Sequence, residues 1–160
     1  MTDDAHPRSG APLVLMVCSS GGHLAQLLTL DTWSEQYRTR WVTFGTQDAR
    51  SALAGRDVVE CYHPTTRHLP NLLRNTWLAW RQLRRERPAV VVSSGAAVAV
   101  PFFVLARLLR VPTVYVEVFD RIDSTTMTGR LVRPFSTLFC VQWDEQLDLY
   151  PGSVNVGALL

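Results

Sequence analysis

Short apolar runs alternate with helical stretches along this chain of 160 residues. The runs are VLMVC from Val14, WVTFG from Trp41, DVVECY, AVVVSSG, PTVYVEV and TLFCVQ. A short apolar run between turns is typical of a strand that is buried on both faces of a sheet. Because strands that alternate with helices are joined by right-handed crossovers, the sequence predicts an α/β fold, a Rossmann-like parallel sheet with helices on both faces.

Helices are expected over residues 23–37, 49–53, 70–87, 96–109 and 127–133. Pro70 suits a helix start because its missing N–H would have no partner there. The first twelve residues, MTDDAHPRSGAP, are polar and rich in turn formers. We therefore expect residues 1–12 to be a disordered tail and residues 13–160 to form one domain.

Composition narrows the classes of function. Hydrophobic residues make up 47% and charged residues 19% of the chain, which fits a folded domain with a substantial core. The net charge of +2 gives no support for a nucleic-acid partner. We find neither a signal-peptide core nor a run of about 18 apolar residues, so no transmembrane helix is expected. Cys18, Cys61 and Cys140 lie in or beside apolar runs without metal-ligand spacing, which predicts reduced, buried thiols and no metal site.

The first apolar run ends abruptly at Ser20, Gly21 and Gly22. A strand-to-helix turn rich in glycine presents free backbone N–H groups, which suits a phosphate or another anion. The turn lacks the third glycine of the dinucleotide fingerprint and the Gly-Lys-Ser/Thr of a Walker loop. The alternative is a tight turn that binds no ligand.

His23 follows this turn directly, at the start of the next helix. A helix N-terminus disfavours an imidazolium, so the ring is expected to be neutral. A neutral imidazole in a crevice can hydrogen-bond a sugar hydroxyl or accept its proton. The alternative is a histidine that only caps or packs the helix.

A second strand-to-helix turn, at Ser94 and Gly95, resembles the first. Glu117 ends the apolar strand TVYVEV, where a buried charge is costly unless it is paired or solvated. The carboxyl ends of parallel strands share one edge, so Glu117, His23 and this turn should converge there. A carboxylate beside an imidazole could deprotonate a hydroxyl. The alternative is a structural carboxylate that caps a loop or pairs with Arg121.

One amphipathic helix combines tryptophan and arginine. Residues 70–87 carry Trp77 and Trp80 beside Arg81 and Arg84, a combination that suits an anionic lipid interface. The apolar residues of PFFVLARLLRV could be core or could extend this patch. Phe102 and Phe103 are about 100° apart on a helix and cannot easily both face one core, so we assign them to the membrane-contact patch. The alternative is an ordinary amphipathic helix with its tryptophans in the core.

Four motifs together resemble a known family. SSGGH, VVVSSGAAVAVPF, YVEVFDRIDSTTMTGRLV and FCVQWDEQLDLYPGSVNVGAL look like the acceptor-side subunit of split glycosyltransferases. That family includes the membrane-anchoring subunit of the eukaryotic dolichol-linked UDP-N-acetylglucosamine transferase and bacterial capsule proteins such as PssD. The resemblance extends to the N-terminal half of MurG-type enzymes, which have the two-domain GT-B fold.

The resemblance implies a division of labour. This chain would bind a polyprenyl-diphosphate-linked saccharide and the membrane surface. A second small subunit would bind the UDP-sugar. His23 and Glu117 would be catalytic, whereas Ser20, Gly21, Gly22, Ser94, Gly95 and Arg121 would contact phosphate or sugar. No metal or cofactor is implied. The expected location is peripheral, on the cytoplasmic face of the inner membrane, as in a bacterial polysaccharide system.

Two positions depart from the family pattern. Val118 follows Glu117, and Asp120 precedes Arg121, where smaller or more polar residues are usual. Two other functions stay open at this stage. The chain could be a non-catalytic scaffold that anchors and activates a partner glycosyltransferase, or a stand-alone nucleotide-binding protein.

Overall fold

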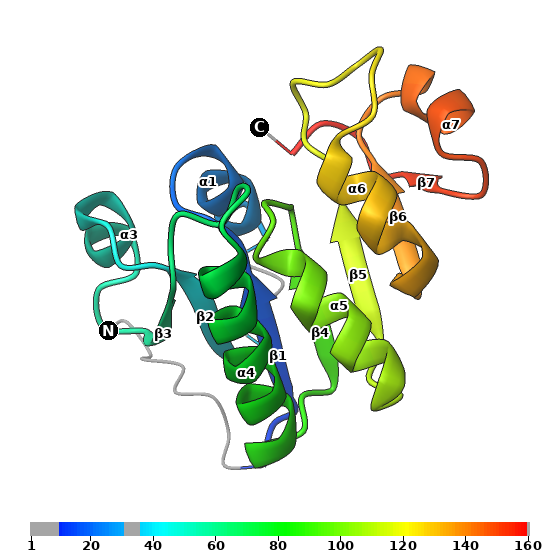
Figure 1. The fold of residues 1–160 in the computed structure, drawn as a ribbon. Coiled ribbons are helices and arrows are strands. Elements are labelled where there is room, and N and C mark those ends of the chain that lie inside the picture. Colours follow the sequence, from blue (N-terminus) through cyan, green and yellow to red (C-terminus); the bar gives the residue numbers. More distant parts are fainter. Residues whose placement is uncertain (1–9, 31–35, 160) are drawn as a thin grey trace.

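A computed structural model describes residues 10–30 and 36–159 (Figure 1). Most of the expected tail, residues 1–9, lies outside the described residues. Seven parallel strands of the described chain form one sheet in the order β3-β2-β1-β4-β5-β6-β7. The strands are β1 (Leu13–Val17), β2 (Arg38–Phe44), β3 (Asp57–Cys61), β4 (Val90–Ser93), β5 (Thr113–Val116), β6 (Leu138–Val141) and β7 (Val154–Asn155). The prediction of a parallel α/β sheet is confirmed.

The helices follow the strands as expected, except at the first and the last helix. They are α1 (Gly22–Leu28), α3 (Gln47–Ala52), α4 (Leu69–Arg85), α5 (Ala99–Leu108), α6 (Met127–Val132), the short 3₁₀ turn η1 (Arg133–Phe135) and α7 (Glu145–Leu149). Helix α1 is shorter than predicted, and residues 31–35 of the predicted helix lie outside the described residues. The sequence reading also missed α7 and β7, which are only five and two residues long.

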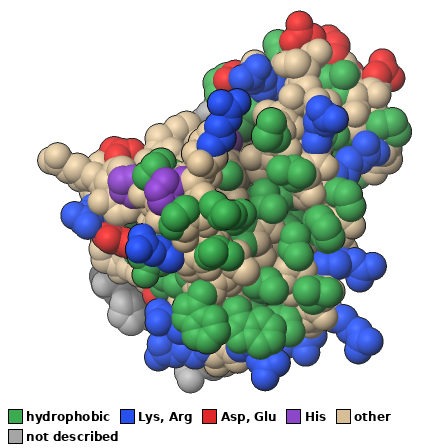
Figure 2. All heavy atoms as spheres, in the orientation of Figure 1, with side chains coloured by type: hydrophobic (Ala, Val, Ile, Leu, Met, Phe, Trp, Pro, Cys, Tyr) green, Lys and Arg blue, Asp and Glu red, His purple; other side chains and the backbone are tan. Residues whose placement is uncertain are grey.

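Helices cover both faces of the sheet because successive strand residues point to opposite sides. On one side, Val14, Met16 and Trp41 pack with α1 and α3. On the other side, Leu15 and Val17 pack with α4, α5 and α6. Figure 2 shows the outer face of these three helices, with hydrophobic side chains across its middle and basic side chains around its edge.

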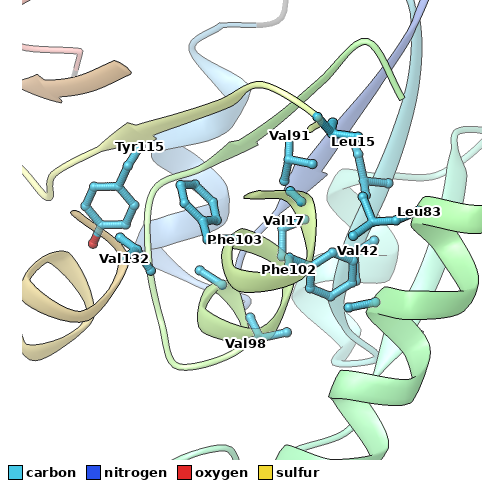
Figure 3. Close-up of a cluster of buried hydrophobic side chains, with 14 of the residues drawn as sticks. Leu15, Val17, Val42, Leu83, Val91, Val98, Phe102, Phe103, Tyr115 and Val132 are labelled. Atoms are coloured by element: carbon cyan, nitrogen blue, oxygen red, sulfur yellow. The ribbon is translucent and has the colours of Figure 1, made fainter. Parts of the chain in front are cut away.

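The assignment of Phe102 and Phe103 to a membrane patch is wrong. Both side chains are 0% exposed and belong to the core between α5 and the sheet (Figure 3). Helix α5 lies between α4 and α6 while its inner side faces β4 and β5, so more than one side of it is covered. Two phenylalanines about 100° apart can therefore both be buried.

The strand order reverses between β1 and β4, since the chain leaves β1 toward β2 and later returns to β1's other side. At such a switch point, the loops that follow the two strands diverge and leave a crevice at the carboxyl edge of the sheet. The glycine turn after β1 and the Ser94-Gly95 turn after β4 both lie at this edge. The fold therefore brings the two turns together, as predicted.

Candidate active site

A pocket of about 310 Å³ opens at this edge. Its walls come from the start of α1, the turn after β4, the end of β5, the loop that follows β5 and the start of α6. The lining residues are Gly22, His23, Gln26, Ala96, Tyr115, Val118, Phe119, Asp120, Arg121, Thr126, Met127 and Thr128. Three of the predicted site residues, Gly22, His23 and Arg121, are among them.

His23 is held in one orientation by the turn after β4. Its Nδ1 lies 3.0 Å from the carbonyl oxygen of Ser94, and the Ser94 hydroxyl donates to the His23 carbonyl at 2.8 Å. A carbonyl can only accept, so Nδ1 carries the proton. The other ring nitrogen, Nε2, is then the basic atom of the neutral ring. Ser94 thus acts on His23 rather than on the pocket itself.

The surroundings keep the imidazole neutral. Burial lowers the pKa of His23 below its usual 6.5, against smaller opposing effects of the Ser94 hydrogen bond and of the Glu117 and Asp120 charges. Gly95 leaves room for the ring, because a Cβ on Gly95 would lie 2.8 Å from His23 Cε1. The site therefore presents a fixed neutral imidazole with one free basic nitrogen.

Glu117 lies behind the pocket wall and is 0% exposed. Its carboxylate accepts hydrogen bonds from the Val118 N–H at 2.9 Å, from the Thr126 hydroxyl at 3.0 and 2.9 Å, and from the Tyr150 hydroxyl. These contacts match the alternative of a structural carboxylate that caps a loop. Pairing with Arg121 is not part of the arrangement, since no ion pair joins Arg121 to a carboxylate within the described residues.

Three buried glutamines hold the loop after β5, residues 117–121. Gln26 and Gln142 both donate to the Glu117 carbonyl, at 3.2 and 2.7 Å. Gln146 donates to the carbonyls of residues 118 and 121, at 3.2 and 2.9 Å. A buried amide is costly unless it is hydrogen-bonded, so these contacts fix the loop. Gln26 also ties the loop to α1, the helix that carries His23.

The first glycine turn differs from the expected open anion site. The Gly21 N–H donates to the carboxylate of Asp48 at 3.2 Å, so an acidic side chain of α3 already occupies this donor. Gly21 has φ +73°, a conformation that favours glycine. A Cβ on Gly22 would meet nothing within 4 Å, which leaves open space on the pocket side. Ser20 does not line the pocket.

The sequence reading missed Tyr115, Thr126 and the three glutamines. A tyrosine or glutamine inside an apolar pattern is a weak signal, because its role depends on distant partners. All three cysteines are free and buried, as predicted. Across residues 10–30 and 36–159, no group of three His, Cys, Asp or Glu side chains is placed to hold a metal ion. No helix in the same ranges has both the length and the apolar character needed to cross a bilayer.

The fold defines a structural class: a Rossmann-like domain equivalent to the N-terminal half of the GT-B fold. The crystal structure of MurG from Acinetobacter baumannii superposes with a TM-score of 0.73 at 19% identity. The superposition covers 91% of this chain and 44% of that enzyme, so this chain spans less than half of MurG. At this identity the likeness establishes the fold.

The family follows from the sequence comparison. The family described as "Oligosaccharide biosynthesis protein Alg14 like" matches residues 55–159, and this chain belongs to it. The human UDP-N-acetylglucosamine transferase subunit ALG14 is 29% identical over 188 residues, covering 98% of this chain and 87% of that protein.

A bacterial relative matches a shorter stretch of the chain. The UDP-N-acetylglucosamine--N-acetylmuramyl-(pentapeptide) pyrophosphoryl-undecaprenol N-acetylglucosamine transferase of Syntrophotalea carbinolica is 33% identical over 79 residues. The match covers 49% of this chain and 21% of that enzyme. The relatives named here are thus glycosyltransferases or a subunit of one.

Proposed function

We propose that this chain is the acceptor- and membrane-binding subunit of a two-chain glycosyltransferase. The partner subunit binds a UDP-sugar, and the acceptor is a polyprenyl-diphosphate-linked saccharide. The observation that carries the proposal is the fixed neutral imidazole of His23 in a pocket at the switch point of the sheet. The names of the relatives support the class of reaction, and they make UDP-N-acetylglucosamine the first donor to test.

In this proposal His23 is the general base. Its Nε2 accepts the proton of the acceptor hydroxyl while that oxygen attacks the anomeric carbon of the donor sugar and UDP leaves. Arg121 lies at the exposed rim of the pocket and suits a phosphate of either substrate. Glu117 acts indirectly, because it fixes the loop and the start of α6.

The pH dependence follows from the lowered pKa of His23. The rate of transfer should stay level above pH 6.5 and fall as the pH drops through the pKa of His23, because the imidazolium cannot accept a proton. The free energy of unfolding should also fall as the pH drops below 6.5. The reason is that His23 binds a proton more readily in the unfolded chain than in the folded one. Initial rates and urea unfolding between pH 5 and 8 measure both, and His23→Gln should remove both changes. An acidic limb centred above pH 6.5 would contradict this role.

In this proposal the membrane-contact surface is the exposed side of α4 alone, because Phe102 and Phe103 are buried. Trp77 is 66% and Trp80 38% exposed, and Leu69, Leu72 and Leu73 are exposed with them. The guanidinium carbon of Arg84 lies over the Trp80 ring, 5.0 Å from the ring centre. In the described chain no carboxylate pairs with Arg81 or Arg84, whose charges are therefore available to anionic lipid. Each such arginine contributes on the order of 1 kcal/mol near an anionic surface.

Removing the two tryptophans should weaken membrane binding without unfolding the chain. We expect Trp77→Ala with Trp80→Ala to reduce co-sedimentation with phosphatidylglycerol-containing vesicles at least tenfold, because exposed aromatic area then no longer enters the interface. The control is Val154→Ala, which truncates an exposed residue of β7. Equal binding by the tryptophan variant and the control would show that α4 is an ordinary solvent-facing helix.

The donor and the acceptor can be identified together. Bacterial membranes that contain lipid-linked acceptor are incubated with this chain, its partner subunit and a panel of labelled UDP-sugars. We expect label from UDP-N-acetylglucosamine to enter the lipid fraction. Incorporation of label from a different UDP-sugar would identify that sugar nucleotide as the donor. No incorporation from any of them would refute glycosyl transfer. Genes of bacterial capsule or exopolysaccharide synthesis are the proposed setting in which to seek the partner.

A further inference from the structure

The hydroxyl of Tyr115 is a buried polar group whose partner is not supplied by the described residues. Tyr115 belongs to β5, is 0% exposed and lines the same pocket as His23. Buried hydroxyls are nearly always hydrogen-bonded in folded proteins, so an exception beside a pocket points to a ligand.

The Tyr115 ring cannot turn its hydroxyl elsewhere. The Phe103 ring forms a T-shaped pair with it at 6.0 Å between ring centres, and the Phe139 ring lies 4.9 Å away at a tilt of 32°. Figure 3 shows the ring at one end of the buried cluster, near Phe103 and Val132. The hydroxyl is therefore held in place before any ligand binds.

Gly95 lies next to both the phenol of Tyr115 and the imidazole of His23. A Cβ on Gly95 would lie 3.1 Å from the Tyr115 oxygen and 2.8 Å from His23 Cε1. Both side chains thus approach the same point beside Gly95, from β5 and from α1. The basic Nε2 of the imidazole is bonded to Cε1, and the phenol can donate its proton to a hydrogen bond.

The competing partner for Tyr115 is the carboxylate of Glu117. Burial, and then the nearby Glu117 charge, raise the pKa of Tyr115 well above 10, so the phenol keeps its proton. The carboxylate is already engaged by Val118, Thr126 and Tyr150. Tyr115 lies close to both Thr126 and Glu117, but its hydroxyl makes no hydrogen bond of normal distance and angle to either.

We propose that the Tyr115 hydroxyl donates a hydrogen bond to an oxygen of the acceptor sugar, beside the hydroxyl that His23 deprotonates. The assignment rests on the proposed function. The two groups at this point are a neutral phenol and a neutral imidazole, which suit an uncharged sugar better than a diphosphate. Asp120 and Arg121 both line the pocket, and the guanidinium of Arg121 is the group left for phosphate.

The test compares Tyr115→Phe with Tyr150→Phe. Both substitutions remove one hydroxyl close to Glu117. Only the Tyr150 hydroxyl is hydrogen-bonded: it donates to the Glu117 carboxylate and accepts from the Thr126 N–H at 3.1 Å. We expect Tyr150→Phe to lower the urea midpoint of the chain, and Tyr115→Phe to leave it unchanged or raise it. A lowered midpoint for Tyr115→Phe would mean that the protein itself uses the hydroxyl, which would overturn the proposal.

Binding is measured by calorimetry with farnesyl diphosphate N-acetylglucosamine, a short lipid-linked sugar. We expect Tyr115→Phe to raise the Kd about 3- to 10-fold, the usual effect of one lost neutral hydrogen bond. Equal Kd values for the variant and the unsubstituted chain would overturn the role of Tyr115 and leave the proposed function standing. No binding by the unsubstituted chain would overturn the proposed acceptor, and the role of Tyr115 with it.

Discussion

Replacing His23 by alanine should reduce the rate of sugar transfer by about 10²–10⁴-fold, the range typical of a lost general base. The reason is geometric: the Ser94 carbonyl fixes the proton on Nδ1, so Nε2 is the basic nitrogen of a half-buried ring that lines the pocket. The measurement is single-turnover transfer with both subunits present.

The same variant separates a shared active site from a scaffold. Binding of the partner should be unchanged in His23→Ala, because the imidazole contacts its own chain. His23→Gln is the matched variant, since its amide can still donate to Ser94 but cannot act as a base. Full transfer by both variants would mean that the partner carries all the chemistry and that this chain only anchors it.

Gly129→Ala should lower the free energy of unfolding by about 2–4 kcal/mol. Gly129 belongs to α6 and lies against the buried carboxylate of Glu117, and an added Cβ would overlap it. The same Cβ would lie 2.7 Å from the Tyr150 hydroxyl, which bonds that carboxylate. Either the helix moves away or a buried charge loses its partners, and both are costly.

Thermal unfolding measures this effect, and the expected fall in Tm is roughly 5–15 °C for a domain of this size. Gly22→Ala is the control, because a Cβ there meets nothing within 4 Å and alanine is the better helix former. If both variants unfolded at the same temperature, the packing of α6 against the hydrogen-bonded Glu117 carboxylate would not be rigid.

The fold could be predicted because its signals are local. Each strand is a short apolar run, and the turns after β1 and β4 carry their own glycines. The meeting of His23 with the Ser94 turn also followed, since parallel strands share one carboxyl edge. The burial of Phe103 did not follow, because it depends on which elements flank α5 on its other sides.

The roles of Glu117 and of the three glutamines depend on contacts between residues that are far apart in the sequence. Tyr150 reaches Glu117 across 33 positions, and Gln26 reaches the same residue across 91. A sequence pattern cannot show that Gln26 and Gln142 converge on one carbonyl, because each glutamine alone is compatible with a surface position. The hydrogen bonds that organise the pocket therefore became visible only in three dimensions.

The measurement that tests the central claim most directly is a three-way transfer assay on membranes with lipid-linked acceptor. It compares this chain alone, the partner subunit alone and the two together, with labelled UDP-N-acetylglucosamine as donor. Transfer that requires both chains is the predicted result, because the pocket of His23 supplies the acceptor side and the partner the donor side. Full transfer by either chain alone would contradict the account.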